Sequence, residues 1–179
     1  MPSPPHRHSA VHALIAALAL MMIDLPAMQA AAATKIVALG ASNTAGWGVG
    51  EANAYPAQLQ ALLRAQGYNV EVVNAGKSFD TTNGMLSRLD GALVPGTSIV
   101  IVQPGGNDMR FFGSEQQRAA NLAEMRKRLA ARHIRMIVFE NAVVPSNLYQ
   151  WDHIHFTAAG HKAAAAYLAR QVGPLLGGH

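Results

Sequence analysis

The sequence predicts an α/β fold of three layers, with a mainly parallel β-sheet between two layers of helices. Short apolar runs alternate with amphipathic segments between residues 34 and 179, which is typical of parallel strands that are buried on both faces. Each run is followed by a loop of glycine or polar residues. Half of the 179 residues are hydrophobic and only 13% are charged, and this composition excludes a disordered chain.

Four apolar runs predict the strands, at 35–40, 69–73, 98–102 and 134–139, with a fifth strand as the alternative. Amphipathic segments between and after them predict helices at about 56–67, 81–89, 114–132 and 157–172. Ser114 and Gln117 form a capping box for the third helix, and Thr157 is placed to cap the last one. Gly173-Pro174 is expected to end that helix.

Residues 1–33 have the order of a secretory signal peptide. Arg7 and no acid precede an uninterrupted apolar run at 13–23, and four alanines follow at 30–33. The run is too short to span a bilayer, which takes about 20 residues. We therefore expect cleavage after Ala30, Ala32 or Ala33, a domain of residues 34–179, and a periplasmic or secreted protein without a stable membrane anchor. The alternative is a buried amino-terminal helix.

Composition and motifs also exclude several kinds of site. The chain has no cysteine, which excludes disulfides, a thiol nucleophile and thiolate zinc sites. The net charge of +4 is spread along the chain, so the basic segment 126–135 favours a solvated helix face, and no nucleic-acid partner is expected. The glycine-rich segment 40–50 lacks the glycines of a dinucleotide-binding fingerprint, and no P-loop occurs, so no cofactor is expected.

Chemically active residues follow the predicted strands, at the edge of the sheet where ligands bind in such folds. Ser42 lies two residues beyond the first strand, and a serine nucleophile needs a base to take its proton. His155 can supply that base, and Asp152 stands three residues before it, where a carboxylate could orient the imidazole. The Gly76 N–H and the Asn107 amide lie at two other strand ends and are the donors that an oxyanion requires.

Plainer alternatives exist for these and neighbouring residues. Ser42 could merely cap a turn, and Asn107 could brace the glycine turn before it. His153 is a rival base, although beside Asp152 it is expected to point elsewhere. A metal site at Asp152, His153 and His155 is a further alternative, but no other ligand cluster is evident, so no metal is expected. Aromatic and Met side chains near the site could line an acyl pocket or pack in the core or in a lid, namely Trp47, Met109, Phe111 and Phe112. His161, in the last helix, is expected to be a packing or exposed residue.

Four short blocks resemble, in their order along the chain, those of the SGNH (GDSL-type) hydrolases. They are GASN at 40–43, a glycine at Gly76, GGND at 105–108 and DHIH at 152–155. The resemblance spans nearly all of residues 35–173 and implies a flavodoxin-like α/β/α fold. It also implies hydrolysis of a carboxylic ester through an acyl-enzyme, without a cofactor. The opening at 39–46 is most similar to that of small exported bacterial esterases and thioesterases.

Carried over by position, the resemblance assigns each block a role. It implies that Ser42 is the nucleophile and also an oxyanion donor through its backbone N–H. Gly76 would donate through its N–H and Asn107 through its side-chain amide. His155 would be the general base and Asp152 its orienting partner, which are the roles that the residues themselves suggest.

The chain departs from the family pattern in two places. Ala41 and Asn43 stand where the family has an aspartate and a leucine. Only residues 140–151 separate the fourth strand from the DHIH block, where the family usually fits another helix and strand, so we expect a reduced cleft that favours small acyl groups. The expected function is therefore an exported serine hydrolase of small esters or thioesters, with a small-molecule ester as partner. The alternative is a catalytically impaired binding module for acyl or carbohydrate ligands; the oligomeric state stays open.

Overall fold

The computed structural model describes Met1, residues 32–111 and residues 113–177. The predicted signal peptide lies outside the described residues except for Met1, Ala32 and Ala33, and so does Phe112. Its cleavage and the export of the protein therefore stay predictions. Within the described part, no helix is both long and apolar enough to cross a bilayer.

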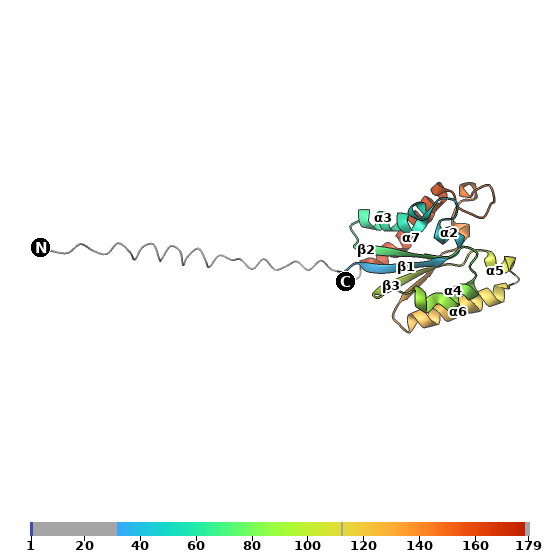
Figure 1. Ribbon diagram of the computed structural model, residues 1–179, viewed down its shortest axis with the longest axis horizontal. Helices are drawn as coiled ribbons and strands as arrows, with labels where there is room; N and C mark the ends of the chain where they lie inside the picture. Colours follow the sequence, from blue (N-terminus) through green and yellow to red (C-terminus); the bar gives the residue numbers. More distant parts are fainter. Residues whose placement is uncertain (2–31, 112, 178–179) are drawn as a thin grey trace. The chain divides into compact units, whose positions relative to one another are not determined.

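Four parallel strands form one sheet in the order β2-β1-β3-β4 (Figure 1). They are β1 (Thr34–Gly40), β2 (Val70–Gly76), β3 (Thr97–Gln103) and β4 (Arg135–Val138). Each strand overlaps the apolar run that predicted it, and the described residues add no fifth strand to the sheet. The prediction of a four-stranded parallel sheet is confirmed.

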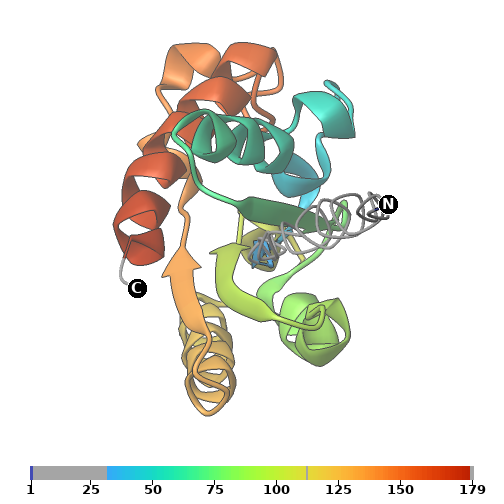
Figure 2. The ribbon, with the colours of Figure 1, turned by 90° about the vertical axis from the view of Figure 1, so that its left-hand side faces the viewer.

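Helices cover both faces of the sheet, as Figures 1 and 2 show. On one side lie α3 (Tyr55–Ala65) and α7 (Ala158–Leu176), and on the other lie α4 (Thr82–Ala92) and α6 (Glu115–Ala130). Successive strand residues point to opposite faces, so Ile36 and Ala38 join the core under α3 and α7, while Val37 and Leu39 join the core under α4 and α6. All four side chains are completely buried. The three-layer α/β/α prediction is confirmed.

Three helices begin at a side-chain cap. Thr81 accepts the N–H of Gly84, Ser114 accepts that of Gln117, and Thr157 accepts that of Gly160, at 3.1–3.2 Å. Such a cap satisfies one of the N–H groups that the first helical turn leaves without a backbone acceptor. The caps at Ser114 and Thr157 are those that the sequence predicts.

The predicted end of the last helix is wrong. Helix α7 continues through Pro174 to Leu176. One of the clashes by which a proline disfavours a helix is with the Cβ of the residue before it, and here that residue is Gly173, which has none. Leu175 and Leu176 also pack against the core under α7. The helix therefore keeps one more turn beyond the point where the sequence predicts its end.

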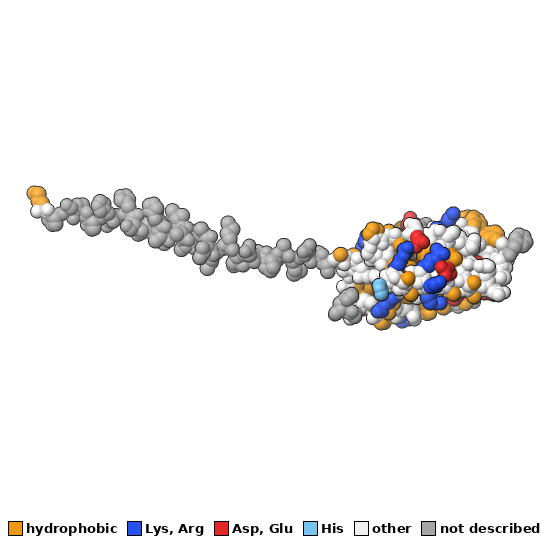
Figure 3. Space-filling model, turned by 90° about the horizontal axis from the view of Figure 1, so that it is seen from below, with side chains coloured by type: hydrophobic (Ala, Val, Ile, Leu, Met, Phe, Trp, Pro, Cys, Tyr) orange, Lys and Arg blue, Asp and Glu red, His pale blue; other side chains and the backbone are white. Residues whose placement is uncertain are grey.

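Basic side chains near the end of α6 lie among acids. Figure 3, which views the face that carries α4 and α6, shows basic and acidic side chains interleaved. Arg128 pairs with Glu124 at 2.9 Å, and Arg132 pairs with Asp90 at 2.8 Å. Exposed pairs of this kind contribute about 0–1 kcal/mol each. They balance the charge of the segment locally more than they stabilise the fold.

The chain between β4 and α7 is short and irregular. It contains two single turns of 3-10 helix, η2 (Asn141–Val143) and η3 (Ser146–Leu148). Tyr149 and Phe156 then form an isolated antiparallel bridge, which closes the loop that carries the DHIH block. This loop lies at the carboxyl edge of the sheet, and it supplies half of the candidate site.

Candidate active site

The carboxyl ends of three strands meet in register at one edge of the sheet. Gly40 pairs with Gly76 on one side and with Gln103 on the other. Both glycines are needed for close packing. A Cβ on Gly40 would overlap the Thr44 hydroxyl, and one on Gly76 would overlap the backbone of Ala45. The absence of two side chains thus lets a helical turn sit directly on the strand ends.

That turn is α2 (Ser42–Ala45), and Ser42 is its first residue. Thr44 anchors it, because its hydroxyl donates to Gln103 Oε1 at 2.9 Å and lies 3.1 Å from the Tyr55 hydroxyl. Burial raises the pKa of Tyr55, only partly offset by its hydrogen bond with Thr44, so the phenol stays protonated and can donate to Thr44. The Ser42 N–H, at the start of the turn, has no intrahelical acceptor and remains available at the sheet edge.

Ser42, His155 and Asp152 form a continuous chain of hydrogen bonds. Ser42 Oγ lies 2.9 Å from His155 Nε2, and His155 Nδ1 lies 2.5 Å from Asp152 Oδ2. The second carboxylate oxygen of Asp152 accepts the backbone N–H groups of Ile154 and His155. Partial burial alone would raise the pKa of Asp152, but these hydrogen bonds outweigh it and lower the pKa to about 2. The ionised carboxylate requires the proton of the neutral imidazole on Nδ1, which leaves Nε2 to accept from the serine hydroxyl.

The rival base His153 does not share this arrangement. Its backbone has a φ of 55°, in the left-handed region, and its side chain has no polar partner among the described residues. It lines a cavity next to Ser42 instead. The same described residues contain no group of three or more side chains placed to hold a metal ion.

Asn43 ties the histidine loop to α2. Its Nδ2 donates to the carbonyl of Ile154 at 3.1 Å, and its Oδ1 accepts the N–H of Phe156 at 2.9 Å. The side chain is buried. A leucine, which the family usually has here, could make neither bond. The sequence marks Asn43 only as a departure from the family pattern, although a polar residue beside Ser42 is a usable signal.

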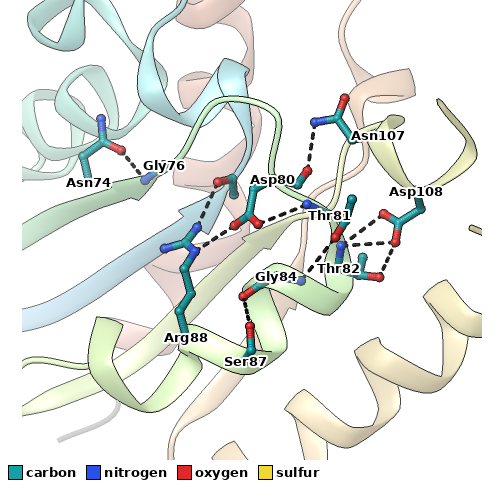
Figure 4. Close-up of polar contacts among 11 residues, drawn as sticks. Asn74, Gly76, Asp80, Thr81, Thr82, Gly84, Ser87, Arg88, Asn107 and Asp108 are labelled. Atoms are coloured by element: carbon teal, nitrogen blue, oxygen red, sulfur yellow. Dashed lines mark hydrogen bonds and ion pairs between the residues drawn. The ribbon is translucent and has the colours of Figure 1, made fainter. Parts of the chain in front are cut away.

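Asn107 is held by the loop that follows β2 (Figure 4). It begins the single turn α5 (Asn107–Arg110), and its Nδ2 donates to the carbonyl of Asp80 at 2.8 Å. Arg88 in turn donates from Nε to Asp80 Oδ2 at 2.7 Å and from its guanidinium to the carbonyl of Gly40 at 3.2 Å. The amide nitrogen of Asn107 carries two hydrogens, so one remains for a ligand.

The structure gives the predicted oxyanion donor Gly76 another partner. Its N–H donates to Asn74 Oδ1 at 2.9 Å (Figure 4). It could serve an oxyanion only after leaving Asn74, and its role there stays a prediction. Three residues further on, Phe79 has a φ of 64° and a backbone N–H without an acceptor among the described residues. Strained backbone of this kind clusters at functional sites, and nothing in the sequence marks Phe79.

Two exposed aromatic rings flank the histidine. The Trp47 ring stacks on His155, with ring centroids 5.4 Å apart and planes 23° from parallel, and Phe79 meets Trp47 edge-on at 5.8 Å. Trp47, Met109 and Phe111 are all exposed, so they do not pack in the core, and the alternative of lid packing stays open. Whether they contact an acyl group stays a prediction.

His161 is a core residue. Its side chain is completely buried, and its Nδ1 accepts the N–H of Tyr55 at 3.1 Å. Its Nε2 has no hydrogen-bond partner in the described part of the chain, and the ring meets Phe156 edge-on. Burial, and to a lesser extent the nearby His155, lower the pKa of His161 to about 4. It is therefore neutral at physiological pH and packs rather than reacts.

The chain belongs to the GDSL-like lipase/acylhydrolase family, because the model of that family matches residues 38–151. The family predicted from the four blocks is thus confirmed. The matched range includes the blocks around Ser42, Gly76 and Asn107 and ends just before Asp152.

Individual relatives agree with this assignment. Over 130 residues the chain is 32% identical to esterase TesA of Pseudomonas aeruginosa, a match that covers 72% of this chain and 63% of that protein. A crystal structure of a protein that is also named TesA superposes with a TM-score of 0.72 at 23% identity, covering 79% of this chain and 99% of that one. Psychrotrophic esterase EstA from Pseudoalteromonas sp. gives 0.69 at 17% identity, covering 81% and 100%. The two structural similarities concern the fold.

Proposed function

We propose that the protein is a serine hydrolase of carboxylic esters that works through an acyl-enzyme on Ser42. The observation that carries this proposal is the unbroken chain from Ser42 through His155 to Asp152 at the carboxyl edge of the sheet. Membership of a family of lipases and acylhydrolases supports the same chemistry. Small acyl esters or thioesters are the proposed substrates.

In the acylation step, Ser42 Oγ attacks the carbonyl carbon while its proton passes to His155 Nε2. Asp152 stabilises the imidazolium through its bond to Nδ1. The carbonyl π electrons move onto oxygen, and the oxyanion accepts from the Ser42 N–H and from the free hydrogen of the Asn107 amide. A third donor comes from the loop after β2, either the predicted Gly76 N–H or the unpaired Phe79 N–H. Collapse of the intermediate expels the alcohol, which takes the proton from His155.

Deacylation repeats these movements with water. His155 takes a proton from a water molecule that attacks the acyl carbonyl, and the same donors hold the second oxyanion. The C–O bond to Ser42 breaks, the acid leaves, and Ser42 Oγ recovers its proton from the imidazolium. Atoms and charges balance at each step without a metal or organic cofactor.

Export through residues 1–33 is part of the proposal. It is supported by the order of Arg7, the apolar run at 13–23 and the four alanines at 30–33. Amino-terminal sequencing of the protein recovered from the periplasm or medium is expected to begin at residue 31, 33 or 34. Recovery only from the cytoplasm with an intact amino terminus would contradict it.

One observation favours the alternative of a binding module without turnover. The Gly76 N–H is already paired with Asn74, and an oxyanion site that lacks a donor loses about 10²–10³ in rate. A fluorophosphonate probe separates the two functions, because it reacts covalently only with an activated serine.

The test combines this probe with hydrolysis of p-nitrophenyl acetate and butyrate. The wild type is expected to react with the probe and turn over both esters, and Ser42→Ala is expected to lose at least about 10⁴ in kcat. Ser87→Ala, on an exposed face of α4, serves as the matched control and should behave as the wild type. Full activity of Ser42→Ala would contradict the proposal, and a folded wild type that stays unlabelled would favour the binding module.

A further inference from the structure

A cavity of about 240 Å³ opens beside Ser42. Its walls come from the loops that follow β1, β3 and β4, and its lining is polar. Arg110 is the one permanently charged lining residue among those described, Ile154 is the one aliphatic side chain, and the lining contains no Asp or Glu. Such walls do not suit a long acyl chain, because burying one against amides and a guanidinium would leave those groups without partners.

The polar lining groups divide into paired and unpaired ones. Asn43 uses both ends of its amide, Gln103 bonds to Thr44 and Asn141, and the Tyr149 hydroxyl donates to the Asn141 carbonyl. Three side-chain donors have no hydrogen-bond partner in the described part of the chain: the Arg110 guanidinium, the Asn141 Nδ2 and the His153 ring. Asn107 Oδ1 is an acceptor without a partner there, since only the Nδ2 of that amide is bonded. Each of the three donor groups offers at least one N–H to whatever occupies the cavity.

Arg110 forms no pair with Asp108, the acid nearest to it in the sequence. Asp108 is buried, and its carboxylate accepts both the N–H and the hydroxyl of Thr82 (Figure 4). Arg110, at the end of α5, lines the cavity from an exposed position and forms no ion pair within the described residues. A guanidinium in this situation recognises carboxylates through charge-assisted, often bidentate hydrogen bonds.

We propose that this cavity binds a free carboxylate carried by the ester substrate, with Arg110 as the counter-charge and Asn141 and His153 as further donors. This inference rests on the proposed hydrolysis at Ser42, and it names the substrate class. Short half-esters of dicarboxylic acids fit it, because their free carboxylate lies only a few bonds from the ester carbonyl that Ser42 attacks.

Two esters of the same size and shape test the proposal. Monoethyl succinate carries a carboxylate where ethyl succinamate carries a neutral amide, and ethanol release from both can be measured by the same coupled assay. The wild type is expected to favour monoethyl succinate in kcat/KM by about tenfold or more. Arg110→Gln should reduce that ratio by about tenfold, and added salt should lower it in the wild type through screening.

Arg126→Gln is the matched control, since Arg126 is exposed on α6 and forms no ion pair within the described residues. It should leave the ratio of the two kcat/KM values unchanged. Hydrolysis of both esters at equal rates, or a preference for the apolar ethyl valerate, would overturn the inference while leaving the proposed function intact. The second result would point to the exposed Trp47 and Phe79 as the substrate surface.

Failure of the folded protein to hydrolyse any ester would instead contradict the proposed function. Titration calorimetry with monoethyl succinate and ethyl succinamate still tests the cavity in that event. Binding of monoethyl succinate that Arg110→Gln weakens about tenfold would support a carboxylate site. Equal binding of the charged and the neutral compound would overturn it.

Discussion

The two sides of Ser42 differ in how their polar groups are satisfied. On the histidine side, the polar side chains that carry the proposed proton transfer have protein partners, from Asp152 through His155 to the Asn43 bonds that hold the loop. On the cavity side, Arg110 and His153 have none among the described residues. Groups paired in the free protein are already oriented for proton transfer. Arg110 and His153 are exposed, so water solvates them in the free protein and a ligand can take the place of that water, which separates the chemistry from the recognition.

Among the residues on the histidine side, Asp152 is expected to cause the largest loss of activity when it is replaced. Asp152→Asn is expected to lower kcat by about 10⁴, because the amide favours the wrong imidazole tautomer while leaving the fold unchanged. Steady-state kinetics with p-nitrophenyl butyrate measures this. Asp90→Asn, on the exposed face of α4, is the control. A loss of less than about tenfold would show that Asp152 does not orient the base.

Asn107 lies between the two sides, and replacing it tests whether its amide stabilises the oxyanion or binds the substrate. Asn107→Ala should lower kcat by about 10²–10³ with little change in KM, as expected for a donor used only in the transition state. Because Asn107 also bonds to the Asp80 carbonyl, the melting temperature of the variant is measured in parallel to detect a loss of stability. If KM rises while kcat holds, the amide binds substrate instead.

Asn43→Leu restores the usual family residue and sharpens the comparison. It removes the two bonds to Ile154 and Phe156, so the free energy of unfolding should fall by about 1–3 kcal/mol. A looser histidine loop should also lower kcat by at least about tenfold. Urea unfolding and kinetics measure the two effects, with the exposed Asn83→Leu as control. An unchanged kcat would mean that Asp152 alone positions the histidine.

The prediction with the smallest expected effect on activity concerns how the pH changes the stability of the protein through His161. Its pKa is about 4 in the folded protein, below the usual 6.5, so the unfolded chain binds the proton more readily. The full stability is present above pH 6.5 and is lost as the pH falls toward 4, by about 2–3 kcal/mol at pH 4.5.

His161→Gln removes this titration, because glutamine does not ionise. The glutamine oxygen can still accept the Tyr55 N–H, so that hydrogen bond is kept. Urea midpoints at pH 7.5 and 4.5 should therefore differ less in the variant than in the wild type. His133→Asn, at an exposed position whose left-handed backbone asparagine tolerates, is the control. Equal pH dependence in His161→Gln and the wild type would show that another group is responsible.

The sequence was sufficient for features that depend on local patterns. Strand ends in a parallel sheet share one edge, so placing Ser42 and His155 near such ends was enough to expect them together. The caps at Ser114 and Thr157 were equally local. The role of Asn43 was not predictable, because its partners lie more than a hundred residues away and depend on how the DHIH loop folds back. The pairing of Gly76 with Asn74 joins residues only two apart, as in an Asx turn, so it is a local pattern too, although the glycine block alone does not indicate it.

The hydrogen bonds of Thr44 that anchor α2 also influence whether the cavity offers donors or acceptors to a ligand. The protonated Tyr55 hydroxyl donates to Thr44, Thr44 donates to the Gln103 carbonyl oxygen, and the Gln103 amide then donates to Asn141 Oδ1. Every donation runs in one direction, so Asn141 has only its NH₂ left to offer. The proton on a tyrosine buried under α7 thereby determines that the far wall of the cavity gives hydrogen bonds rather than accepts them.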